Sequence, residues 1–217
     1  MRIDCFWKAA IVCAAISAPT IARAGVVTVN ATDSIFVGAN GELPTTGQND
    51  PPLLPYAVTA PVEIAVAAGD VVTISATGQV APGIGAQTNG PAGAAGATNL
   101  TAFGIIGGID YSTHFFLAGA FIGTGTGSGE YSPFYIGDGG TFIAPSGSTE
   151  LLLGLPDGYA FVGAPSYYGD NSGSFTVTYD VTVPEPDMDI AMFGLTAAVL
   201  GLGRTRARRR ECVALQA

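Results

Sequence analysis

The stretch Phe175-Thr176-Val177-Thr178-Tyr179-Asp180-Val181-Thr182-Val183 alternates apolar and polar side chains without a break. Successive side chains of a β-strand point to opposite faces of the sheet, so this alternation is typical of a half-buried antiparallel strand. We therefore predict that residues 175–183 form the last strand of a β-sandwich.

Six other short runs are apolar or alternating and rich in β-branched and aromatic residues, and clusters of Gly and Pro separate them. They are residues 26–29, 62–66, 71–75, 114–121, 141–144 and 151–155. Segments 78–98 and 123–129 are rich in Gly and small residues and are predicted to be loops. The pattern predicts one all-β domain over residues 25–183, folded as an antiparallel β-sandwich.

The N-terminus has the three parts of a secretory signal peptide. Arg2 and Lys8 precede the apolar stretch 9–16, and the small residues Ala22 and Ala24 occupy the recognition positions of a cleavage site. We predict a signal peptide over residues 1–24, removed on export.

The C-terminus combines Pro184-Glu185-Pro186, an uncharged apolar segment at 190–203 and a basic cluster. The cluster consists of Arg204, Arg206, Arg208, Arg209 and Arg210. As a helix the apolar segment would rise about 21 Å, less than the roughly 30 Å hydrocarbon core, and the arginines would face the cytoplasm. The alternative is a buried helix with a solvated basic tail.

This arrangement resembles the PEP-CTERM sorting signal of Gram-negative bacteria. The resemblance implies a sorting signal over residues 184–210, with a short transmembrane helix, and a cytoplasmic tail over 211–217. It further implies that the precursor passes through the inner membrane and is processed by an exosortase, so that the mature protein reaches the cell surface or extracellular matrix.

The body between these signals is strongly anionic. The chain has 8 basic residues, all at or before Arg23 or at or after Arg204, and 17 acidic residues, of which all but Asp4 and Glu211 lie between 25 and 189. Such a body repels phosphate backbones and attracts cations, so a nucleic-acid partner is not expected. Of the chain's three cysteines, Cys5 and Cys13 lie in the predicted signal peptide and Cys212 in the C-terminal tail, so no disulfide is expected in the body.

Oxygen-bearing side chains gather at Asp157 and at Asp170-Asn171-Ser172-Gly173. Calcium takes oxygens from carboxylates, amides and backbone carbonyls, and Asp170 with Asn171 offers two such ligands from one turn. The alternative is an ordinary tight turn in which Gly173 takes a positive φ.

Segments 68–78, 89–93 and 168–177 resemble, in that order, the galactophilic PA-I lectin family, a small calcium-dependent jelly-roll-like sandwich. The resemblance implies that calcium is held by the side chains of Asp157, Asp170 and Asn171 and by the backbone carbonyls of Tyr167 and Pro82. Strict counting places Gly163 where Asp157 is assigned. The family's sugar-contacting Tyr, His and Gln are absent, since Pro82 and residues 94–99 stand in their places, so the resemblance implies calcium more directly than galactose.

Aromatic faces stack on sugar rings, and we predict that Tyr167 and Tyr168, beside the proposed calcium loop, line a ligand face. The chain has a single histidine, His114, and no pattern around it indicates the nucleophile and orienting acid that catalysis would need, or the further ligands of a histidine metal site. No spacing of carboxylates singles out an acid and a base for hydrolysis. The protein is therefore not expected to be an enzyme.

Two functions follow from these observations. The first is an exported, exosortase-processed surface or matrix protein whose lectin-like module binds carbohydrate with calcium in extracellular polysaccharide or biofilm. The second is a non-catalytic structural matrix protein that calcium stabilises or cross-bridges without specific sugar recognition.

Overall fold

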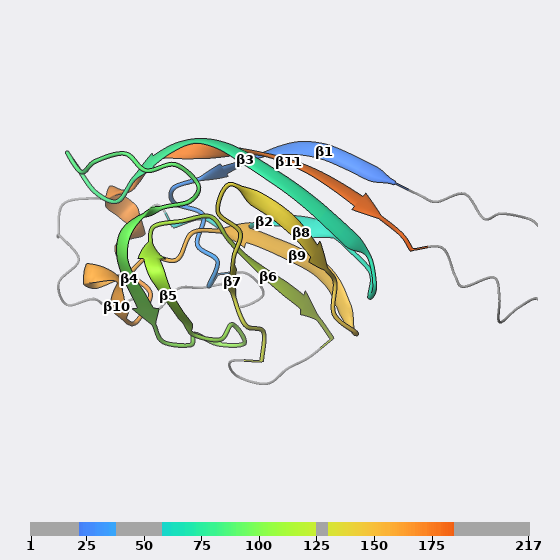
Figure 1. Ribbon diagram of the computed structural model, residues 1–217. Helices are drawn as coiled ribbons and strands as arrows, with labels where there is room; N and C mark the ends of the chain where they lie inside the picture. Colours follow the sequence, from blue (N-terminus) through green and yellow to red (C-terminus); the bar gives the residue numbers. More distant parts are fainter. Residues whose placement is uncertain (1–21, 38–57, 125–129, 185–217) are drawn as a thin grey trace, which may run out of the picture. The chain divides into compact units, whose positions relative to one another are not determined.

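The computed structural model describes residues 22–37, 58–124 and 130–184 (Figure 1). These belong to one compact unit, Ile21–Pro184. Most of the predicted signal peptide, the apolar segment 190–203 and the arginine cluster lie outside the described residues. Within the described ranges, no helix is long and apolar enough to cross a membrane.

The described chain is all-β, and its strands form three sheets. The first sheet has the order β1 (Arg23–Asn30), β11 (Ser172–Thr182), β3 (Val71–Ala81), β8 (Gly139–Ile143). The second has the order β2 (Val62–Ala65), β9 (Ser148–Gly154), β6 (Ala118–Gly123), β7 (Phe134–Tyr135). The third has the order β10 (Val162–Gly163), β4 (Ala94–Leu100), β5 (Ile109–His114). All pairings are antiparallel except β10 with β4, which confirms the predicted all-β antiparallel class.

The first two sheets share a hydrophobic core, as expected of a β-sandwich. Leu151 and Leu153 of β9 pack into this core with residues of β3 and β11, whereas Leu152 points to a second core with Ile35 and Phe36. The second sheet is thus buried on both faces. This double burial explains why β9 reads as a continuous apolar run rather than an alternating one.

The predicted strand 175–183 is confirmed as the core of β11. Phe175, Val177 and Val181 are fully buried, while Thr176 and Thr178 are exposed. The strand begins earlier than predicted, at Ser172, and is an inner strand hydrogen-bonded to both β1 and β3. The alternating apolar residues of β11 therefore form the face of the strand that packs into the sandwich core.

The predicted loop 78–98 is wrong at both ends, because β3 continues to Ala81 and β4 begins at Ala94. Gly78 has φ +110°, and a Cβ there would lie 2.5 Å from the carbonyl oxygen of Ser174. Only glycine allows the two backbones to approach so closely. Backbone pairing with β11 thus maintains the exposed residues 77–79 of β3, and the strand regains an apolar side chain in the core only at Val80.

The predicted strand 114–121 is also wrong as a single element. β5 ends at His114 and β6 begins at Ala118, with a turn between them in which the buried Phe115 has φ 53°. The turn residues Phe115, Phe116 and Leu117 are all fully buried, so their apolar run reads like a strand. Of the predicted loop 123–129, only residues 123 and 124 are described.

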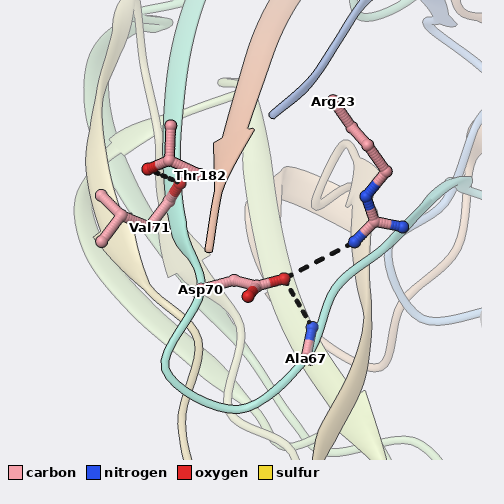
Figure 2. Close-up of polar contacts among 5 residues, drawn as sticks. All are labelled: Arg23, Ala67, Asp70, Val71 and Thr182. Carbon is pink, nitrogen blue, oxygen red and sulfur yellow. Dashed lines mark hydrogen bonds and ion pairs between the residues drawn. The ribbon is translucent and has the colours of Figure 1, made fainter. Parts of the chain in front are cut away.

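An ion pair links the start of β1 to the turn before β3 (Figure 2). The guanidinium of Arg23 lies 3.5 Å from Oδ2 of the buried Asp70, and the same oxygen accepts a hydrogen bond from the Ala67 N–H at 2.8 Å. Beside it, the Thr182 hydroxyl donates to the Val71 carbonyl at 3.4 Å. β1 begins at Arg23, two residues before Gly25, which is the predicted start of the mature chain.

Candidate functional site

Asp157 lies where the chain leaves β9, at the end of a continuously buried stretch. Its side chain is 3 % exposed. Oδ1 accepts a hydrogen bond from the Gly158 N–H at 2.8 Å, and Oδ2 accepts one from Nδ2 of Asn171 at 2.7 Å. The structure therefore brings together Asp157 and Asn171, which are 14 positions apart in the sequence.

The amide of Asn171 has one satisfied end and one unsatisfied end. Nδ2 donates to Asp157 and to the Ala31 carbonyl, the latter at 3.2 Å. These two acceptors determine the orientation of the amide. Oδ1, on the other end, is buried and has no hydrogen-bond partner among the residues that the structure describes. A buried acceptor in this state costs about 1–3 kcal/mol, and a cation or a water molecule would remove the cost.

Tyr168 supports Asp157 from the core. Its hydroxyl donates to the Leu155 carbonyl and accepts from the Asp157 N–H, both at 2.9 Å. Burial first, and then the negative charge of Asp157, raise the pKa of Tyr168 well above its usual range. The side chain is only 2 % exposed, which does not agree with the prediction that Tyr168 lines a ligand face.

The turn η2 (Tyr168–Asp170) brings Asp170 beside the loop that follows β3. Oδ2 of Asp170 lies 3.1 Å from the position that a Cβ on Gly83 would take. Pro82, which directly precedes Gly83, is partly buried. Figure 1 shows the orange turns at the end of the unit where β3 passes into this loop. Asp170 and the Pro82 segment, predicted to belong to one site, are therefore close together.

Gly163 has a different position from the predicted ligands. It belongs to β10, where it is paired with Leu100 of β4, and its φ is +85°. Without a side chain it cannot replace the carboxylate of Asp157. The geometry therefore favours Asp157 over Gly163 as the partner of Asn171.

Tyr167 forms an aromatic pair that the sequence did not reveal. Its backbone is left-handed, with φ 69°, and its ring centroid lies 5.4 Å from that of Tyr159 at an angle of 39°. Tyr159, in the turn η1 (Tyr159–Phe161), is 63 % exposed. The sequence contained one usable signal. Tyr159 follows Asp157-Gly158 soon after the end of β9, a position typical of a surface loop.

The donors near Asn171 suit a hard cation such as calcium. They are the carboxylates of Asp157 and Asp170 and the amide oxygen of Asn171, which has no partner among the described residues. The carbonyl of Tyr167 lies a few residues earlier in the same loop, and Pro82 precedes Gly83, which lies close to Asp170. Within the described ranges no three His, Cys, Asp or Glu side chains cluster as a metal site. Calcium accepts amide and carbonyl oxygens as well as carboxylates, so this donor set fits calcium and does not fit zinc.

Comparison with known proteins finds likeness among solved structures alone. No family model and no curated protein matches the chain. Among solved structures, the chain is similar to one described as "EclA N-terminal domain; PllA-like lectin", with 16 % identity and a TM-score of 0.38. The likeness covers 72 % of this chain and 94 % of that chain.

Proposed function

We propose that this protein is an exported, calcium-dependent carbohydrate-binding module that acts in extracellular polysaccharide or biofilm. The observation that carries the proposal is the buried Oδ1 of Asn171, which has no hydrogen-bond partner among the described residues and belongs to the amide whose Nδ2 is bonded to the carboxylate of Asp157. Native proteins rarely leave such a group unsatisfied, and a bound cation is one of the few groups that satisfies it without rearranging the fold.

Calcium would be held by the side chains of Asp157, Asp170 and Asn171, with the carbonyls of Pro82 and Tyr167. When bound, calcium offers coordination positions to the hydroxyl groups of a sugar. The protein residues bind and orient, and no proton transfer is assigned to them. The module is therefore proposed to bind without catalysis.

Export of the module is part of the proposal. Asn171 directly precedes β11, and that strand ends at Thr182, two residues before the start of the predicted sorting signal. With exosortase processing and membrane passage of the precursor included in the proposal, the mature module would act outside the cell.

A second candidate function is a structural matrix protein that calcium stabilises or cross-bridges. The observation that favours it is the absence of any basic residue from position 24 to 203, a range with 15 acidic residues. Several exposed carboxylates, among them Asp110 and Asp180, could bind calcium weakly and join molecules. In this case Asn171 would have no special importance for calcium binding.

Calorimetric titration of the full chain with calcium tests the proposal. Wild type is compared with Asn171→Ala and with Asp110→Ala, which removes an exposed carboxylate on β5 and serves as the matched control. Saturable binding that is lost in Asn171→Ala and retained in Asp110→Ala supports the module. Binding that both variants retain, together with calcium-driven self-association in light scattering, supports the matrix function instead.

A further inference from the structure

Backbone strain is concentrated in the loop between β9 and β11. Four non-glycine residues of the described chain have a positive φ, and three of them, Ala160, Phe161 and Tyr167, lie in this loop. A backbone of this kind is strained and persists only where its surroundings enforce it. Strain of this kind at one loop points to a functional role for the side chains that the loop presents.

Phe161 is the anchor that maintains the strained turn. Its ring stacks on His114, with centroids 4.3 Å apart and an angle of 6°, and lies 6.3 Å from the ring of Phe115. It also packs against the main hydrophobic core, and its N–H donates to the Gly158 carbonyl at 2.8 Å. With Phe161 held inward, Tyr159 is directed to solvent.

The other end of the loop is closed onto the site. The Ser166 N–H donates to the Asp157 carbonyl at 3.1 Å, and Gly158 pairs with Pro165 as an isolated bridge. This closure brings Tyr167 back beside Tyr159. Because Tyr159 is two residues from Asp157, their Cα atoms are at most about 7.6 Å apart. The exposed ring of Tyr159 and the half-buried ring of Tyr167 therefore belong to the same closed loop as the proposed calcium ligand Asp157.

We propose that Tyr159 and Tyr167 form a stacking subsite for a sugar ring adjacent to the one at calcium. The inference rests on the proposed function and deepens it: the module would bind a neutral glycan of at least two sugar units rather than a single sugar. Aromatic faces bind the C–H face of a sugar by dispersion and apolar burial. The glycan is proposed to be neutral because positions 24 to 203 contain no Lys or Arg to hold a carboxylate or sulfate.

Affinity electrophoresis of the full chain, in a detergent without a sugar head group, provides the test. Gels contain galactomannan, dextran or xylan as neutral probes, or hyaluronan as an anionic probe, each with calcium or with chelator. The variants are Tyr159→Leu, which removes the ring but keeps apolar bulk, and Tyr159→Phe, which keeps the ring. Tyr111→Leu is the matched control, since Tyr111 is also exposed and its ring stacks on Tyr135 at another place in the fold.

We expect calcium-dependent retardation by a neutral polysaccharide that is about tenfold weaker in Tyr159→Leu and within twofold of wild type in Tyr159→Phe and Tyr111→Leu. Calcium titrations should be the same for all four proteins. If Tyr159→Leu binds the polysaccharide as well as wild type, the stacking subsite is overturned and the calcium-dependent module stands. Stronger retardation by hyaluronan overturns the neutral class, and no retardation by any probe overturns both proposals.

Discussion

Replacing Asn171 with Ala tests whether its side-chain oxygen is a calcium ligand or whether the amide only stabilises the fold. The substitution removes the hydrogen bonds from Nδ2 to Asp157 and to the Ala31 carbonyl, and it also removes the buried, unpartnered Oδ1. The first change destabilises the fold, and the second stabilises it. If Oδ1 is a calcium ligand, its removal lowers the stability further only when calcium is present.

The magnitude follows from these contacts. The neutral hydrogen bond contributes about 1 kcal/mol and the charge-assisted one about 2 kcal/mol, while removal of the unsatisfied oxygen returns about 1–3 kcal/mol. The net loss in chelator is therefore at most about 2 kcal/mol, or up to roughly 8 °C in Tm for a domain of this size. Calcium at 100 times its Kd stabilises wild type by about 2.7 kcal/mol more, which widens the gap to roughly 5–19 °C.

Thermal unfolding followed by tyrosine fluorescence, in chelator and in excess calcium, measures both gaps. Asn99→Ala, at an exposed position of β4, is the matched control and should stay within about 0.5 kcal/mol of wild type in both conditions. A gap between wild type and Asn171→Ala that is the same size with and without calcium would refute the assignment of Oδ1 as a calcium ligand.

Further outcomes are expected at three other places in the fold. Tyr168→Phe removes the hydrogen bond that the hydroxyl donates to the Leu155 carbonyl, which keeps its bond from the Ile35 N–H, and the one that it accepts from the Asp157 N–H, so urea unfolding should show a loss of about 1–3 kcal/mol. Because the folded pKa of Tyr168 is raised, wild-type stability should fall as pH rises above about 10, where the unfolded hydroxyl ionises, and this fall should be smaller in Tyr168→Phe. Burial lowers the pKa of His114, so the folded state favours the neutral imidazole. The contribution of His114 to stability is therefore present above about pH 6.5 and is lost as pH falls below that value. His114→Phe should make the urea midpoint less dependent on pH in this range. Arg23 is 46 % exposed, so Arg23→Ala should lower the free energy of unfolding by less than about 1 kcal/mol. Asp70→Ala also removes the hydrogen bond from the Ala67 N–H and should cost at least about twice as much. Equal losses would contradict the geometry of the turn.

The parts of the fold that could be predicted are those in which burial alternates along a strand or is continuous. β11 was readable because one face meets the core and the other meets water, and β9 because both of its faces are buried. The second half of β3 was not readable, since Gly78 and its neighbours are held by backbone pairing with β11 rather than by apolar side chains. β4 shares this composition of Ala and Gly and was missed for the same physical reason.

The candidate site was predictable in part. Asp157, Asp170 and Asn171 have the residue types and the positions after strands that a calcium site needs, and the structure brings Asp157 and Asn171 into contact. The position of Tyr168 in the core was not predictable, because its hydroxyl satisfies two backbone groups of a distant segment. The exposure of Tyr159 depends on the anchoring of Phe161 by His114, a contact between residues far apart in sequence.

The register of β11 on β3 connects the fold to the site. Ser172 is paired with Ala81, so the residues just before β11 are placed beside the loop that begins at Pro82. A slip of one residue would turn Phe175 and its alternate neighbours from the core to solvent, and the cost of exposing them holds the register. The alternation that identifies β11 as a half-buried strand thus also determines which residues meet at Asn171. Substitutions that weaken the buried face of β11 should therefore reduce calcium binding even where they are remote from every proposed ligand.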